Sequence, residues 1–271
     1  MNTMILGLLA ETSIHPGAGQ SAGFVDLPVA REAATDYPVI VGSSFKGALK
    51  DAAEQLVPNG AEDARIKATF GKSDAAGDLL VSDARLLLLP VRSLTSQFKW
   101  VTCPHLIERY ERDQARRKRN GTALVVSCPK GKYLGSGAGM LFLEERQFDR
   151  HGDLASSLVD LIGPLVPHKS TRERLTGQLV VINDDDFSWF ARYGLAVTAR
   201  NQLNNNKTSN NLWYEETLPA ESLFYALLAE RRDGALEHVW SVFKDRPYLQ
   251  VGGNETIGQG WFAVQRVEGG K

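Results

Sequence analysis

The amino-acid sequence predicts an α+β fold with a ferredoxin-like, or RRM-like, core, and the order of its periodic segments is the main reason. Short apolar runs predict buried strands, whereas apolar residues spaced by three and four predict helices. In chain order the segments are a strand, a helix, further strands, a helix and a closing strand, which is the order of that core. They are Met4–Glu11, Ser44–Leu56, Leu79–Val91, Glu221–Glu230, Ala235–Phe243 and Gly260–Val267.

The middle third of the chain, residues 92–175, is interpreted as an insertion into this core. Before it, the strand at Leu79–Val91 is expected to bend near Ser82 and Asp83 and to stop at Pro90. A helix is predicted at Pro104–Lys118, where Pro104 takes a first-turn position. Further strands are predicted at Thr122–Val126 and Met140–Phe148, and short helices at Leu154–Ile162 and Phe187–Arg192.

Residues 195–218 predict a long β-hairpin. The arms Leu195–Leu203 and Asn211–Leu218 are β-prone, and the segment NNNKTSN between them is polar and rich in turn residues. Lys207 is the only charge of the tip.

Composition limits the functions open to this chain. Its 271 residues with 43% hydrophobic content can bury a substantial core, either as one elaborated domain or as two small ones. The net charge of −1 argues against bulk attraction to nucleic acid, so any RNA binding must use local basic patches. Two cysteines, Cys103 and Cys128, suit neither a disulfide framework nor a zinc site, and a reducing cytoplasm is expected. No apolar stretch approaches the roughly 20 residues that span a bilayer.

The segment His15–Glu32 joins a glycine-rich loop to two groups that handle protons. Gly17 and Gly19 allow close approach of backbone to a ligand, and both His15 and Asp26 can act on protons. That combination suits binding and cutting a phosphate chain. An Asp before Leu-Pro is nevertheless more often a turn residue, and a His before Pro often bonds loop backbone.

A second motif lies at the predicted helix start, GSSFKGALK. Ser43 and Ser44 are expected to be N-cap residues, which would leave helix amides facing an anion beside Lys46. The spacing does not match a Walker A loop, which argues against an NTPase. The alternative for Lys46 is a solvated surface lysine.

Four blocks in this order resemble the backbone subunit of type III-B CRISPR effector (Cmr) complexes, within the RAMP superfamily: HPGAGQSxGxVDLPVxRE, GSSFKGALK, LWYEETLP and GGNETIGQG. The resemblance covers most of the chain. It implies a single RAMP-type domain over residues 1–271, with a ferredoxin-like palm whose helix is Ser44–Leu56, a helical insertion, and a β-hairpin thumb at residues 195–218.

The same resemblance implies functional residues. Asp26 matches an Asp implicated in metal-dependent cleavage of target RNA, as a ligand of Mg or Mn or as a base, and His15, Tyr214 and Glu215 are secondary candidates. Guide RNA contacts are implied for the helix-start block and the final loop, and the thumb would displace a base. The RNA-binding set is Gly17, Gly19, Ser43, Ser44, Lys46, Lys50, Lys207, Asn254, Thr256 and Gln259.

Two other charged clusters have simpler interpretations. Asp184, Asp185 and Asp186 are adjacent, and consecutive side chains make a poor metal cage, so helix capping is favoured. The basic run Arg116–Arg119 fits RNA contact and a solvated helix end equally well.

The expected function is therefore that of a filament subunit that binds guide RNA and cuts complementary single-stranded target RNA at regular intervals. Its expected partners are copies of itself and other subunits of the complex, and no membrane. Two alternatives stay open: a scaffold subunit without cleavage, and a stand-alone CRISPR RNA-processing endonuclease.

Overall fold

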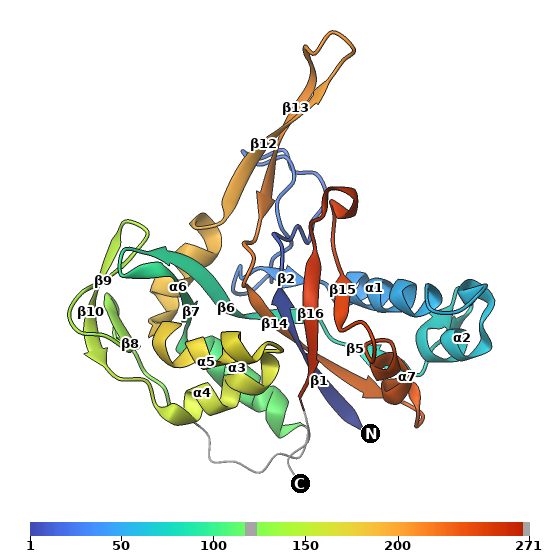
Figure 1. The fold of residues 1–271 in the computed structure, drawn as a ribbon, viewed down its shortest axis with the longest axis horizontal. Coiled ribbons are helices and arrows are strands. Elements are labelled where there is room, and N and C mark those ends of the chain that lie inside the picture. The colour runs from blue at the N-terminus through green and yellow to red at the C-terminus, as the bar shows by residue number, and fades with distance from the viewer. Residues whose placement is uncertain (117–123, 268–271) are drawn as a thin grey trace.

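The computed structural model describes residues 1–116 and 124–267, which are built around one large mixed sheet (Figure 1). The strand order is β15-β16-β1-β14-β6-β7-β11-β8-β10-β9, while β5 pairs with β14 and β2 pairs with β6. The strands of this sheet are β1 (Thr3–Ala10), β2 (Val39–Ile40), β5 (Leu79–Val81), β6 (Ala84–Ser93), β7 (Ser96–Thr102), β8 (Lys132–Gly135), β9 (Leu141–Leu143), β10 (Arg146–Gly152), β11 (Leu179–Ile182), β14 (Leu223–Glu230), β15 (Tyr248–Gln250) and β16 (Trp261–Arg266).

One half of the sheet carries the repeated strand-helix pattern. Strand β1 lies between β14 and β16 and is antiparallel to both, and β14 is antiparallel to β5 and β6. Helix α1 (Gly42–Glu54) follows β1 and β2, and helix α7 (Ala235–Ser241) connects β14 to β15 and β16. Helix α2 (Ala64–Phe70) and a small β3 (Gly71–Lys72) and β4 (Ala75–Ala76) pair lie beside α1.

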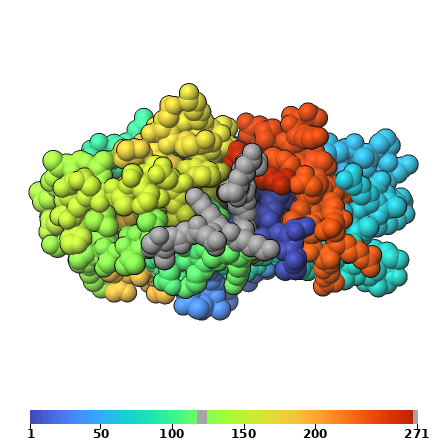
Figure 2. Space-filling view, turned by 90° about the horizontal axis from the view of Figure 1, so that it is seen from below, coloured from blue at the N-terminus to red at the C-terminus, as the bar shows by residue number. Residues whose placement is uncertain are grey.

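The other half is a lobe in which helices gather around β7 to β11 (Figure 1). Its helices are α3 (Pro104–Ala115), α4 (Ser156–Ile162), α5 (Lys169–Gln178) and α6 (Asp184–Tyr193). Seen from below, the N-terminal strand lies between this lobe and the half that carries α7 and α2 (Figure 2). Short 3-10 turns occur at η1 (Gly60–Glu62), η2 (Gly163–Leu165) and η3 (Glu255–Ile257).

The core forms where both halves meet the central strands. Ile5, Leu6, Phe224 and Phe262 are fully buried, as expected for strands covered on both faces. Gly7 lies in β1 where η2 crosses, and a Cβ there would lie 2.2 Å from the Leu165 carbonyl oxygen. Only glycine lets the two backbones approach this closely.

A two-stranded hairpin of β12 (Ala196–Leu203) and β13 (Ser209–Thr217) projects from the body (Figure 1). Its tip is a closed turn, because the Asn204 side-chain oxygen accepts hydrogen bonds from the amides of Asn206 and Thr208 at 2.9 and 3.0 Å. Lys207 adopts φ +59° at this turn.

Several sequence predictions need correction. The helix runs over Gly42–Glu54 rather than Ser44–Leu56, and α3 ends at Ala115. Strand β6 continues through Pro90 to Ser93. Pro90 is paired with Trp100 of β7, and the pairing of β6 with β14 on its other edge ends at Leu88. Proline has no amide hydrogen, and at this position β14 no longer needs one from β6.

The insertion is also more than helical. Residues 92–175 contain the strands β7 to β10. Strand β7 and helix α5 were not predicted from the sequence, and neither were α2 and β11, which lie outside this range. The predicted strand at Thr122–Val126 begins outside the described residues, and its remainder forms no strand. One reason is that the Leu124 amide donates to the Glu111 carboxylate of α3 at 2.7 Å, and so binds a side chain instead of a neighbouring strand.

Both cysteines are buried free thiols. Within residues 1–116 and 124–267, no helix is long and apolar enough to cross a membrane.

Candidate active site at the hairpin base

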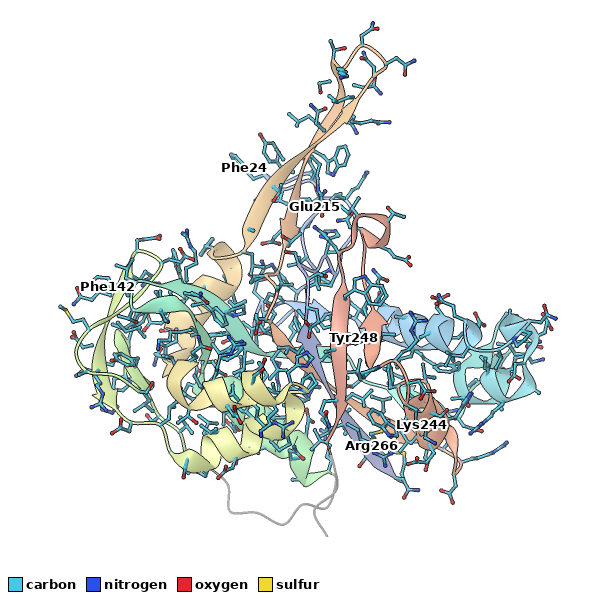
Figure 3. The ribbon with its side chains drawn as sticks, viewed as in Figure 1. Phe24, Phe142, Glu215, Lys244, Tyr248 and Arg266 are labelled. Atoms are coloured by element: carbon cyan, nitrogen blue, oxygen red, sulfur yellow. The ribbon has the colours of Figure 1, made fainter. Side chains whose placement is uncertain are left out.

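Three segments that are far apart in sequence meet where the hairpin leaves the body (Figure 3). The loop after β1 runs along β13, since the Leu27 amide donates to the Tyr214 carbonyl at 3.1 Å and the Glu216 amide donates to the Leu27 carbonyl at 3.0 Å. The loop before β16 joins them through the Gly253 amide, which donates to the His15 carbonyl at 2.9 Å. We call this place the hairpin-base site and define it by His15, Asp26, Tyr214, Glu215 and Asn254.

Asp26 is half-buried, and its carboxylate is held at one oxygen. Oδ2 accepts a hydrogen bond from the Tyr214 amide at 2.7 Å, and the Asp26 carbonyl accepts one from the Ser21 amide at 2.9 Å. Within the described residues Oδ1 makes no hydrogen bond. The side chain therefore ties the loop to β13, whereas the local sequence indicated a turn residue that bonds its own backbone.

His15 is buried inside the loops of the site. Its Nδ1 lies 2.7 Å from the Glu216 carbonyl oxygen, and because a carbonyl can only accept, Nδ1 carries the proton. A Cβ at Gly17 would lie 2.9 Å from His15 Nε2, so this glycine makes room for the imidazole. This geometry favours the positioning role that the sequence suggests for a His before Pro.

Glu215 is also buried, and it joins the hairpin to the final loop. Its Oε1 accepts a hydrogen bond from Arg200 Nη2 at 3.4 Å and another from Asn254 Nδ2. Asn254 Nδ2 also donates to Gln259 Oε1 at 2.9 Å. Asn254 therefore bonds a protein carboxylate and Gln259 bonds Asn254, whereas Thr256 of the same loop is exposed.

Exposed aromatic and apolar side chains surround the site. Phe24 is fully exposed in the glycine-rich loop (Figure 3), and Tyr214 and Leu212 on β13 are about half exposed. Bases stack on such side chains in single-strand binding proteins. Sequence reasoning missed Phe24, although a lone phenylalanine among glycine, serine and alanine was a usable signal.

The helix-start motif does not form the expected anion site. Helix α1 begins at Gly42 with Val41 before it, so Ser43 and Ser44 lie in the first turn and are not N-cap residues. The Gly42 amide donates to Asp83 Oδ1 at 2.7 Å, which places a protein carboxylate where an RNA phosphate was expected. The early start follows from β2, whose pairing with β6 turns the chain at Val41.

The lysines of this motif lie along α1. Lys46 Nζ donates to the Leu79 carbonyl at 3.2 Å, and the pKa of Lys46 is lowered by burial and further by Arg231. Lys46, Lys72 and Arg231 line one open hollow beside β3 and β4. Lys50 pairs with Glu54 at 3.6 Å, and Lys207 is exposed at the hairpin tip.

The acidic cluster caps helices, as the sequence indicates. Asn183 is the N-cap of α6 and accepts from the Asp185 amide at 3.0 Å, while the three Asp occupy the first turn. Asp184 Oδ1 accepts from the His105 amide of α3 at 2.9 Å, and Asp186 accepts from the Gly131 amide at 2.7 Å. In the part of the chain that the structure describes, no group of three or more His, Cys, Asp or Glu forms a metal cage.

Only the first residue of the basic run is described. Arg116 pairs with Asp113 at 3.0 Å, and residues 117–119 lie outside the described ranges. Nearby Arg109 binds both carboxylate oxygens of Glu32, at 2.6 and 2.7 Å. The described part of this basic patch therefore pairs with protein carboxylates.

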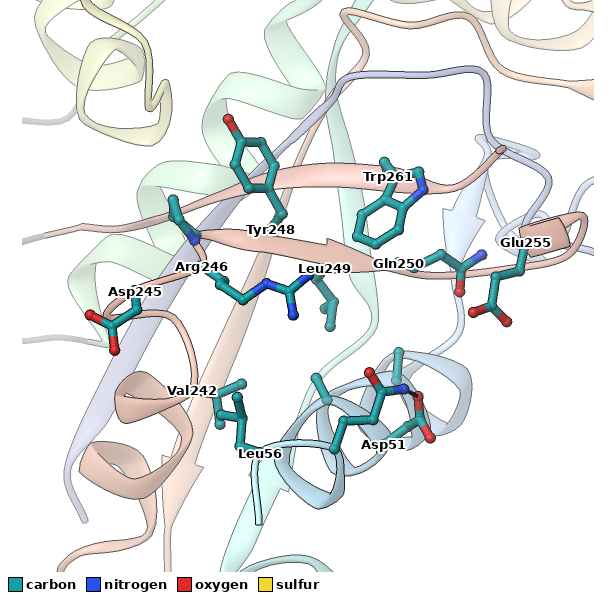
Figure 4. A pocket seen from close by; sticks show the side chains of 14 residues that line it. Asp51, Leu56, Val242, Asp245, Arg246, Tyr248, Leu249, Gln250, Glu255 and Trp261 are labelled. Carbon is teal, nitrogen blue, oxygen red and sulfur yellow. Dashed lines mark hydrogen bonds between the residues drawn. The ribbon is translucent and has the colours of Figure 1, made fainter. Parts of the chain in front are cut away.

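A groove of about 490 Å³ lies between α1 and β15 (Figure 4). Leu56, Tyr248 and Trp261 are partly exposed in it. The charged residues lining it are Asp51, Asp245 and Glu255 against Arg246 alone, so its net charge disfavours phosphate. RNA contact is therefore expected elsewhere, and the hairpin-base site has the better chemistry for it.

Comparison with known proteins shows the family of this chain. A family model, the RAMP superfamily, matches residues 8–263. The chain belongs to the RAMP superfamily. The CRISPR system Cmr endoribonuclease Cmr4 of Pyrococcus furiosus is 32% identical over 99% of this chain and 97% of its own length.

RAMP structures of the Cmr4 type have the same fold. The crystal structure of oligomeric Cmr4 from P. furiosus superposes with a TM-score of 0.80 at 26% identity, with 100% of both chains covered. A type III-B Cmr-beta structure bound to cognate target RNA superposes with a TM-score of 0.78 at 21% identity, with 98% of both chains covered, and supports the fold alone.

Proposed function

We propose that this RAMP protein is the guide-RNA-binding filament subunit of a type III-B CRISPR interference complex and that it cleaves complementary target RNA at regular intervals. One observation carries the proposal: the full-length similarity to a Cmr endoribonuclease, at 32% identity. The hairpin-base site supports it, because Asp26 Oδ1 has no hydrogen bond within the described residues and could bind a ligand. Exposed aromatic side chains, Phe24 and Tyr214, belong to the same segments.

The finer description of the fold belongs to the same proposal. The order β16-β1-β14-β5, with helical connections α1 and α7, is that of a ferredoxin-like sheet, and we assign this half as the palm of one RAMP-type domain spanning residues 1–271. Residues 195–218 would be the thumb and residues 92–175 the insertion.

Asp26 is the proposed catalytic residue. The 2′-hydroxyl of a kinked target nucleotide would attack the adjacent phosphorus, and a cyclic phosphate would remain. The 5′-oxygen of the next nucleotide would leave and take a proton from water, which gives a 5′-hydroxyl end. Asp26 Oδ1 would take the hydroxyl proton, and the hydrogen bond from the Tyr214 amide to the other oxygen supports this role.

In the alternative role of Asp26, its Oδ1 would bind a divalent metal, Mg or Mn, instead of taking the proton. Mg²⁺ commonly binds through one or two protein carboxylates together with substrate phosphates and waters. Glu215 is buried against Arg200 and Asn254, so it is engaged within the protein. A bound metal would supply charge stabilisation at the phosphate.

The proposed RNA contacts divide into two groups. Gly17, Gly19, Thr256, Asn254 and Gln259 belong to the loops of the hairpin-base site. Ser43, Ser44, Lys46, Lys50 and Lys207 lie on α1 and at the hairpin tip, and they would contact phosphates along a longer path. Guide RNA, target RNA, further copies and other complex subunits are the proposed partners, and the cytoplasm the proposed location.

The reaction type is tested with the protein assembled with guide RNA and partner subunits. We expect a regular ladder of products from labelled target RNA, each ending in a cyclic phosphate. A target with a single 2′-deoxy nucleotide at one cleavage position should lose that band and keep the others. Uniform cutting of the deoxy target would exclude attack by the 2′-hydroxyl, and no ladder at all would favour a scaffold subunit.

A further inference from the structure

We propose that Arg31 and Glu216 form a positioning pair that holds the Asp26 segment on the outer edge of β13 without contacting RNA. The inference rests on the proposed function for its catalytic consequence. Its structural part stands on hydrogen bonds alone.

The first step is that β13 offers one edge to the loop. Trp213 and Glu215 lie opposite Arg200 and Thr198 of β12. The backbone groups of Tyr214 and Glu216 instead bond to Asp26 and Leu27, and Leu27 forms a parallel bridge with Glu215. This segment therefore covers a strand edge that would otherwise be unpaired.

The second step is that Glu216 holds the segment at several points. Its side chain is 9% exposed, and its carboxylate accepts hydrogen bonds from the Val29 amide at 3.0 Å and from Arg31 Nη2 at 2.7 Å. Its carbonyl oxygen lies 2.7 Å from His15 Nδ1. One residue thus anchors both ends of the loop that carries Asp26.

The third step is that both terminal nitrogens of the Arg31 guanidinium donate to protein groups. Besides Glu216, its guanidinium donates to the carbonyls of Asp36 at 2.9 Å and Ala191 at 2.7 Å. Ala191 belongs to α6, so Arg31 ties the loop to the helical lobe as well as to the hairpin. An arginine used in this way acts on the reaction only through the position of Asp26.

The test uses amide hydrogen exchange of the free protein, which needs no cleavage. In Glu216→Ala, the amides of Leu27 and Tyr214 should exchange roughly tenfold faster or more, although the Glu216 side chain bonds to neither. Glu216→Gln should have a smaller effect, since an amide oxygen still accepts from Val29. The control Arg85→Gln breaks another partly buried pair, Arg85–Asp113 at 2.6 Å, and should leave both amides unchanged.

In the RNA-loaded complex, Glu216→Ala should lower the single-turnover cleavage rate by about 10- to 100-fold, because small misplacements of a reacting group are costly. RNA affinity should stay within about twofold of wild type, since neither residue faces phosphate. If Glu216→Ala leaves the exchange rates of the Leu27 and Tyr214 amides unchanged, the positioning role of the pair is wrong. A loss of RNA affinity as large as the loss of cleavage rate would also overturn it. A wild-type complex that never cleaves contradicts the proposed function, while exchange still decides the positioning claim.

Discussion

At the scale of single residues, the sequence singled out candidate groups but did not show what they bond to. Asp26 stood out as a carboxylate in a glycine-rich loop, yet the amide that fixes it belongs to Tyr214, 188 positions away. Arg31 and Glu216 lie in two of the blocks that carry the resemblance, but they were missed because a sequence does not distinguish a buried ion pair from two solvated charges. Long-range hydrogen bonds of this kind leave no periodicity in a sequence.

Lys46 gives the first residue-scale prediction. Burial and Arg231 lower its pKa below 10.5, so in the free protein its ammonium should titrate below that value. A bound phosphate favours the charged form, and the pKa should therefore rise when RNA binds. Nitrogen chemical shifts of the lysine side chain, followed against pH with and without guide RNA, measure both values.

Salt dependence supplies the control for Lys46. Lys46→Met should reduce the salt slope of guide binding by about 0.7, the value for one phosphate contact on a single strand. Lys67→Met on the neighbouring helix α2, where Lys67 pairs with Glu62, should leave the slope unchanged. If Lys46→Met and Lys67→Met both keep the wild-type salt slope, Lys46 makes no phosphate contact and only donates to the Leu79 carbonyl.

At the scale of elements, long periodic segments were predictable and short ones were not. The hairpin arms and the strands β1, β14 and β16 were recognised to within a few residues, because each is a clear β-prone run. The helix start at Gly42 was misplaced, since the pairing of β2 with β6 overrides the capping preference of Ser43 and Ser44. Likewise β7 and β11 form because each finds a partner strand in the sheet.

The hairpin tip carries the next prediction. Replacing Asn204–Asn210 by a short Gly-Ser turn should leave the melting temperature nearly unchanged, because the tip buries no apolar surface. Product spacing on a sequencing gel, or filament assembly, should change. Lys207→Gly is the matched variant: it removes the charge at a residue with φ +59°, a backbone conformation that glycine adopts readily. An unaltered ladder from the shortened hairpin would show that the tip is an ordinary loop.

The contact between α7 and α2 predicts an acid-sensitive element. His238 is buried with Nδ1 at 2.7 Å from Thr69 Oγ1, and burial lowers its pKa below 6.5. The unfolded chain therefore binds a proton more readily, and stability should fall as pH drops below 6.5 toward the folded pKa. His238→Gln should flatten this fall in thermal melts between pH 7 and 5, whereas the exposed His151→Gln should melt like wild type. Parallel curves for all three proteins would contradict the assignment.

At the scale of the whole molecule, the loop that carries Asp26 is bonded to two helices of the helical lobe and to the hairpin. Arg31 links it to α6, Glu32 links it to α3 through Arg109, and Glu216 links it to the hairpin. The helical lobe is thus attached to the proposed active site, which composition and spacing gave no reason to expect.

The most direct measurement of the central claim is the single-turnover rate of target RNA cleavage by complexes assembled with Asp26→Asn. Loss of one acid-base group should slow cleavage by roughly 10² to 10⁴-fold, with target affinity unchanged. Asp74→Asn, a carboxylate of the β3–β4 turn paired with Lys72, should cleave at the wild-type rate. An Asp26→Asn complex that cuts the ladder as fast as wild type would contradict the account.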